Sequence, residues 1–244
     1  MGLRKFAVLL CAEDSEYVKS KYAGYFGVFK AMLAGPGEEW DVFRVTRGEL
    51  PRDEAEIGLY DGFVITGSCS DAHGSDRWIH DLLDFLKKLD SLKKKVLGIC
   101  FGHQILSRAL GGTIGRAKSW DIGLRNVQPS ATSKLFSSLK LPSGLSIIEC
   151  HRDEVKELPP KAEVIAFSDK TGIEMFSFGD HIMGIQGHPE YTKDILLHLI
   201  DRLLQKTLIT ESYADDLKAN IGACEPDKEA WRTLCISFLK GTPL

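Results

Sequence analysis

The chain has 244 residues, of which 43% are hydrophobic and 27% are charged, and its formal net charge is −3. This length suits one α/β domain with a sizeable core. The near-balanced charge lacks the strong positive field that nucleic acids or anionic membranes select, so we expect neither as a partner. Six cysteines are scattered without a CxxC pair or a zinc-type spacing. They favour reduced thiols in the cytosol over a disulfide framework.

Apolar runs and helical patterns alternate through the first half of the chain. Strand-like runs stand at 6–10, 40–45, 60–68 and 95–99, and helical patterns stand at 24–33, 77–89 and 103–110. The first run is short and meets acidic residues at once, so we interpret it as a core strand and not as a secretory signal. Alternation of this kind predicts a parallel sheet with helices on both faces.

The alternation of strand-like and helical segments stops after about residue 121. Strand-like runs with short connectors, which predict antiparallel additions to the sheet, follow at 145–150, 163–168, 173–179 and 181–187. Helical patterns stand at 193–208 and 229–241. No internal repeat or linker is evident in the sequence. We therefore predict a single domain over 1–244, with a C-terminal helical extension at about 209–244.

One cysteine stands where a nucleophile would be placed. Cys100 lies between Gly98 and Gly102, at the point where the strand-like run 95–99 gives way to a helix. This is the pattern of a nucleophile elbow, in which the neighbours of the nucleophile must be small. The helix dipole is expected to lower the pKa of the thiol from about 8.5, and the N–H of Phe101 to face a developing oxyanion. The alternative is a buried structural cysteine, which is how we interpret the other five.

A thiol nucleophile needs a base and a group that orients the base. His188 follows the strand-like run 181–187, and Glu190 stands two residues later. The pair predicts an imidazole whose tautomer is fixed by a carboxylate. A second oxyanion donor is expected at Gly67 or Ser68, where the run 60–68 ends, although an ordinary strand-to-loop turn explains that stretch equally well. His103 and His151 are further candidates for the lining of the site.

The segments GICFGHQ at 98–104 and GHPE at 187–190 together resemble the class I glutamine amidotransferase family, over the chain from the first strand to about residue 205. The resemblance implies a flavodoxin-like three-layer α/β fold with a mostly parallel sheet. It also implies a catalytic triad of Cys100, His188 and Glu190. It further implies that Gln104 contacts the glutamine, that Asp153 faces the substrate and that Gly67-Ser68 form the oxyanion loop. The loop reads TGS here, where the family commonly has a GGP-type sequence.

Within that family, the chain resembles the free-standing plant γ-glutamyl peptidases through KYAGYFGVF at 21–29, WDVFRVTRGELP at 40–51 and FLKG at 238–241. The resemblance implies a hydrolase that cleaves the γ-glutamyl amide bond of glutathione conjugates, in glucosinolate and related sulfur metabolism, through a γ-glutamyl thioester. It implies neither metal nor cofactor. Such a leaving group needs space, and we expect Tyr22 and Tyr25 to line it, together with the loop 68–74.

Two other functions fit the same residues. The chain could be a glutaminase subunit that delivers ammonia to a separate synthetase, or a non-enzymatic thiol sensor in which Cys100 is oxidised. The oriented base formed by His188 and Glu190 argues against a sensor, which has no need of one. The expected partner is a small γ-glutamyl molecule, and the sequence does not indicate an oligomeric state.

Overall fold

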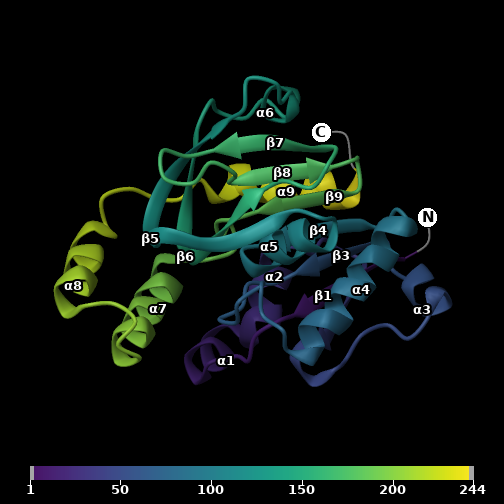
Figure 1. Cartoon of the computed structure of the whole chain (residues 1–244), viewed down its shortest axis with the longest axis horizontal. Helices are drawn as coiled ribbons and strands as arrows, with labels where there is room; N and C mark the ends of the chain where they lie inside the picture. Colours follow the sequence, from purple (N-terminus) through teal and green to yellow (C-terminus); the bar gives the residue numbers. More distant parts are fainter. Residues whose placement is uncertain (1–2, 242–244) are drawn as a thin grey trace.

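The computed structural model describes residues 3–241, which form a nine-stranded sheet of order β2-β1-β3-β4-β9-β8-β7-β5-β6 (Figure 1). The first five strands in this order run parallel: β2 (Glu38–Arg44), β1 (Arg4–Leu10), β3 (Gly62–Ile65), β4 (Lys95–Ile99) and β9 (Ile182–Ile185). The others are antiparallel: β8 (Met175–Phe178), β7 (Ala162–Phe167), β5 (Thr113–Pro129) and β6 (Leu145–Glu157). The predicted α/β fold is confirmed.

Strand β9 differs from expectation, because the sequence placed it among the antiparallel additions. It pairs parallel with β4, from Val96 opposite Ile182 to Ile99 opposite Ile185, and antiparallel with β8. All of its residues are buried, as an inner strand covered on both faces requires. The residues that follow β9 therefore emerge beside those that follow β4.

Helices cover both faces of the parallel part of the sheet. On one face, α2 (Gly24–Leu33) and α9 (Lys228–Lys240) pack on a core that includes Phe6 and Val8 of β1. On the other face, α4 (Arg77–Ser91) and α5 (Phe101–Ala109) pack on a core that includes Ala7 and Leu9. Side chains alternate between the two sides of a strand, so β1 contributes to both cores.

The helix nearest the C-terminus belongs to the first of these cores. Trp231 of α9 is fully buried, and its Nε1 donates to the Ser146 carbonyl at 3.0 Å. The Arg4 guanidinium donates to the Lys240 carbonyl at 2.9 Å, which joins the first strand to the last helix. Trp231 and Leu234 of α9 are therefore both part of this core.

The antiparallel half carries a third apolar cluster, in which α7 (Lys193–Gln205) and α8 (Glu211–Asn220) pack against β5 and β6. These helices lie beyond the sheet at the left of Figure 1. The remaining helical segments are short: α1 (Glu16–Tyr22), α3 (Glu54–Gly58), α6 (Leu135–Ser138) and a 3₁₀ turn at Val45–Arg47. Among residues 3–241, no helix has the length and apolar character needed to cross a bilayer.

Candidate active site

Cys100 occupies a strained turn between β4 and α5. It is the N-cap residue of α5 and has φ +54° and ψ −102°, a left-handed conformation that costs a non-glycine residue about 1–3 kcal/mol. A Cβ atom on Gly98 would lie 2.5 Å from the carbonyl carbon of Gly102, and one on Gly102 would lie 2.5 Å from the Ile65 carbonyl oxygen. Only glycine fits at either position, so the strand, turn and helix have the geometry of an elbow.

His188 is held from three sides. Its backbone N–H donates to the Ile148 carbonyl at 2.7 Å, and its Nδ1 lies 2.9 Å from Glu190 Oε1. Its ring stacks on Tyr191, with ring centres 3.8 Å apart and planes 3° apart. The bond to Glu190 occupies Nδ1 and leaves Nε2 for the thiol. Glu190 therefore stands where an orienting carboxylate is expected, and Tyr191 fixes the plane of the ring.

Gly67 lies next to the side chains of both Cys100 and His188. A methyl group built on Gly67 would lie 2.9 Å from His188 Cε1 and 3.7 Å from Cys100 Cβ. Gly67, Cys100 and His188 each follow one of three neighbouring parallel strands, β3, β4 and β9. The carboxyl ends of parallel strands meet at one edge of a sheet, and that is where open α/β folds bind ligands.

The ionisation of Cys100 differs from the expectation. Burial raises the pKa of its thiol well above the usual range, and the nearby acidic groups of Cys150, Glu149 and Glu190 add to the rise. The N–H of Phe101 bonds the sulfur and lowers the pKa by less than burial raises it. In this buried setting, desolvation outweighs the helix terminus, so the thiol carries its proton at rest.

A cavity of about 190 Å³ opens over these residues. Most of the residues predicted for the site line it, including Cys100, His188, Glu190, Gly67, Ser68, Gln104, Asp153, Tyr25 and His151. Burial raises the pKa of Tyr25 to about 12, so its hydroxyl keeps its proton. Sequence reasoning missed other lining residues, namely Arg116, Trp120, Cys150, Arg152, Tyr191, Arg202, Leu203 and Lys206.

Tyr22 and His103 lie away from the cavity, whereas Phe101, predicted for its N–H alone, keeps its backbone at Cys100. Tyr22 does not line the cavity, because its hydroxyl donates to Asp194 at 2.6 Å and lies 3.1 Å from the Thr192 hydroxyl, on the side of α7. The ring of Phe101 is buried 5.6 Å from that of Trp78, so only its backbone faces Cys100. His103 is fully buried, its ring 5.0 Å from that of Phe176, and burial lowers its pKa to about 3.

Gln104 reaches the cavity from the first turn of α5. Its amide nitrogen donates to the Asp153 carbonyl at 2.8 Å and to Gln186 Oε1 at 3.1 Å. The same Asp153 carbonyl lies 3.0 Å from His151 Nδ1. These bonds fix the orientation of the Gln104 amide and link it to β6.

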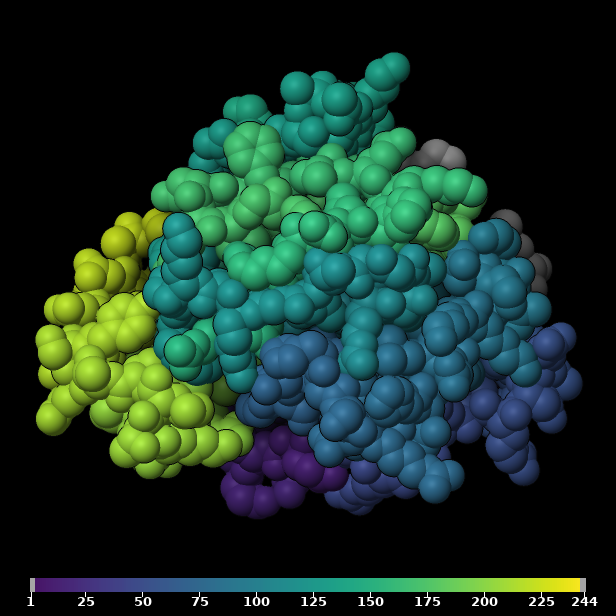
Figure 2. Space-filling view, viewed as in Figure 1, coloured from purple at the N-terminus to yellow at the C-terminus, as the bar shows by residue number. Residues whose placement is uncertain are grey.

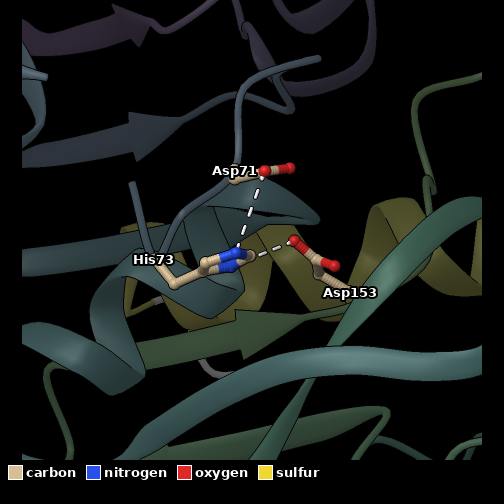
Figure 3. Close-up of side chains that lie close together, drawn as sticks. All are labelled: Asp71, His73 and Asp153. Carbon is tan, nitrogen blue, oxygen red and sulfur yellow. Dashed lines mark ion pairs between the residues drawn. The ribbon is translucent and has the colours of Figure 1, made fainter. Parts of the chain in front are cut away.

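Asp153 also belongs to an ion-pair cluster at the rim of the cavity, where its carboxylate faces His73 and Asp71 (Figure 3). Its oxygens lie 3.3 Å from His73 Nδ1 and accept from Arg116 at 2.9 Å. Arg116 also donates to Asp71 at 2.9 Å. Asp71, His73 and Asp153 each offer one atom that could bind a metal ion, and these three atoms lie within 4.8 Å of one another. Arg116 neutralises both carboxylates, so the arrangement is that of an ion-pair network and does not favour a cation.

Comparisons with known proteins identify the family of this chain. The family model described as "Glutamine amidotransferase class-I" matches residues 29–198. Gamma-glutamyl peptidase 5 of Arabidopsis thaliana is 50% identical over 242 residues, which cover 98% of this chain and 96% of that protein. This chain belongs to the class I glutamine amidotransferase family. The predicted resemblance to this family and to its γ-glutamyl peptidases is confirmed.

Other members of the class I glutamine amidotransferase family share less of the sequence. Gamma-glutamyl peptidase 3 of A. thaliana is 48% identical over 98% of this chain and 97% of its own length. A putative glutamine amidotransferase of Saccharomyces cerevisiae is 31% identical over 80% of this chain and 82% of its own. A crystal structure of a glutamine amidotransferase from Thermotoga maritima aligns with a TM-score of 0.75, at 20% identity, over 98% of this chain and 100% of that one. This structural likeness supports the α/β fold of the chain.

Proposed function

We propose that this class I glutamine amidotransferase hydrolyses the γ-glutamyl amide bond of small peptides, with Cys100 as nucleophile, His188 as base and acid, and Glu190 as the group that orients His188. One observation carries the proposal: a Cβ atom built on Gly67 would lie within 4 Å of both Cys100 Cβ and His188 Cε1, and the three residues line one cavity. The sequence likeness to Arabidopsis γ-glutamyl peptidases supports the choice of substrate.

The proposed reaction starts from the neutral thiol. As the Cys100 sulfur attacks the γ-carbonyl carbon, His188 Nε2 takes the thiol proton, and the carbonyl electron pair moves to oxygen. The N–H groups of Phe101 and of Gly67 or Ser68 stabilise that oxyanion, each by about 10²–10³ in rate. His188 returns the proton to the departing amine, which leaves a γ-glutamyl thioester. Water, deprotonated by His188, then releases glutamate and restores the thiol.

The physiological substrates we propose are glutathione conjugates in the cytosol, including those of glucosinolate and related sulfur metabolism. A γ-glutamyl conjugate and glutamine differ only in what is attached to the leaving nitrogen, so the same groups at the reacting carbon serve both. A glutaminase that serves a separate synthetase is the alternative, and it predicts that glutamine is the better substrate.

The purified chain tests the proposal when it is incubated with glutamine, glutathione and an S-substituted glutathione. We expect release of glutamate from the conjugate and, by intact-mass measurement after a rapid acid quench, a γ-glutamyl adduct on Cys100. Cys100→Ser should keep the fold, as judged by circular dichroism, and lose turnover by at least about 10³. Turnover by that variant at the wild-type rate would overturn the mechanism, and a preference for glutamine would favour the alternative.

A further inference from the structure

Three elements, β5, β6 and α7 with the segment after it, contribute a further set of residues to the lining of the cavity that contains Cys100. We call this set the outer arm and define it by Trp120 of β5, Arg152 of β6, and Arg202, Leu203, Lys206 and Leu208 at and beyond the end of α7, all of which line the cavity. Figure 2 shows the teal residues of β5 beside the yellow-green residues of α7 and α8 on one face of the molecule.

The wall of the outer arm is held together by specific contacts. Trp120 Nε1 donates to the Leu208 carbonyl at 3.2 Å, which ties β5 to the segment after α7. The Arg152 guanidinium lies 5.9 Å from the centre of the Trp120 ring, within the range of a cation–π contact. The indole is half-buried. The arm is thus a built surface, with an aromatic ring at a fixed position.

Positive charge in the outer arm is not balanced. The carboxylates that line the cavity all have partners: Glu13 pairs with Arg47 at 2.7 Å, Asp71 and Asp153 with Arg116 at 2.9 Å, and Glu190 with His188 at 2.9 Å. Among residues 3–241, by contrast, no carboxylate pairs with Arg152, Arg202 or Lys206, and Arg202 is half-buried. A half-buried guanidinium without a partner favours an anionic ligand.

Apolar surface lies next to these cations. Trp120 and Leu203 are half-buried and Leu208 is 46% exposed, in the same wall of the cavity as Arg202 and Lys206. A ligand that fits this surface carries a carboxylate and an apolar group on the side away from the scissile bond. Glutamine has neither there, because its leaving group is ammonia.

We propose that the outer arm binds the leaving group of a γ-glutamyl peptide: Arg202, with Lys206 and Arg152, binds its C-terminal carboxylate, and Trp120 and Leu208 contact an apolar substituent on its side chain. The inference rests on the proposed function, because it takes the γ-glutamyl carbonyl to lie at Cys100. It makes Arg202 a specificity-determining residue that discriminates γ-glutamyl peptides from glutamine and from γ-glutamyl amines.

A binding experiment tests this assignment without any turnover. In the Cys100→Ser background, calorimetry compares S-benzylglutathione with its C-terminal amide, which differs only in the carboxylate. We expect the acid to bind about tenfold or more tightly, the magnitude of one charge-assisted hydrogen bond. Adding Arg202→Gln should lower the ratio of acid to amide affinity toward one, because only Lys206 and Arg152 remain to bind the carboxylate, and should weaken the amide less than about twofold.

Controls separate the outer arm from general electrostatics and from the other carboxylate of the ligand. Lys118 is exposed on β5, two residues from Trp120, and does not line the cavity, so Lys118→Gln removes the same charge nearby and should leave the ratio unchanged. Trp120→Ala should weaken S-benzylglutathione more than unsubstituted glutathione. Equal weakening of acid and amide by Arg202→Gln would place Arg202 at the α-carboxylate of the γ-glutamyl group and overturn the assignment, as would a Lys118→Gln effect of equal size.

Failure of the proposed function has a different signature. If the wild-type chain forms no γ-glutamyl adduct and releases no glutamate, the hydrolase proposal fails, whatever the affinities show. If turnover occurs and the acid and amide bind equally, the outer arm proposal fails and the hydrolase proposal stands.

Discussion

Replacing Gly67 by alanine tests the convergence of Cys100 and His188 most directly. The new methyl group would lie 2.9 Å from His188 Cε1, closer than carbon atoms approach without a shift, since optimal contacts lie at about 3.5–4.0 Å. The imidazole, stacked on Tyr191 and bonded to Glu190, would have to move by about 0.5–1 Å. Displacements of about 1 Å at a reacting group cost about 10²-fold in rate. We therefore expect kcat/KM to fall by about 10- to 100-fold.

The assay is glutamate release from a glutathione conjugate, with thermal unfolding measured on the same samples. Gly67 does not have a positive φ, so alanine strains no backbone there, and we expect Tm to change by less than about 4 °C. Gly172→Ala is the matched control, because a Cβ at Gly172 meets nothing within 4 Å. Wild-type kcat/KM in Gly67→Ala would refute the view that Gly67 contacts the reacting groups.

Three further perturbations have defined outcomes. Glu190→Gln should lower kcat by about 10²–10⁴ with little change in KM, since the carboxylate that fixes the His188 tautomer is lost; steady-state kinetics measure it, and an unchanged kcat would remove Glu190 from the mechanism. Trp231→Ala should lower the free energy of unfolding by about 3–5 kcal/mol, as measured in urea, and a loss below about 1 kcal/mol would show that α9 is not part of the core. Burial lowers the pKa of His103 to about 3, so below about pH 6.5 the unfolded chain binds a proton that the folded chain does not. The free energy of unfolding therefore decreases as the pH is lowered below about 6.5. His103→Gln should weaken that dependence between pH 7 and 5, and an unchanged slope would contradict the cause.

The parts of the site that sequence reasoning located are those marked by local chemistry. Gly98 and Gly102 flank Cys100 because the elbow leaves no room for a Cβ at either position, so the spacing itself carries the signal. His188 and Glu190 stand two residues apart and bond to each other. Such features can be found from short segments, and the strands and helices around them were predicted within a few residues.

Features that depend on distant segments escaped sequence reasoning. Asp153 was predicted, but its ion pairs were not: Arg116 comes from β5, Asp71 from the loop after β3 and Asp153 from β6, and no local pattern connects the three. Strand β5 was missed because its residues are mostly exposed or half-buried and its pairing shifts register between Arg116 and Asp121. Its hydrophobic residues therefore show neither the alternation typical of a strand nor the spacing typical of a helix. Tyr22 was expected at the cavity, but its hydroxyl bonds Asp194, which lies 172 residues away along the chain.

The position of β9 in the sheet has a consequence for synthesis on the ribosome. Strand β4, which ends just before Cys100, has β3 on one side and β9 on the other, and β9 begins at Ile182. Part of the face that α2 and α9 cover stays open until residues 228–240 have emerged. A nascent chain therefore exposes part of its central strands for most of its translation. His188 comes beside Cys100 only late, so the proposed chemistry requires the chain at least through Glu190.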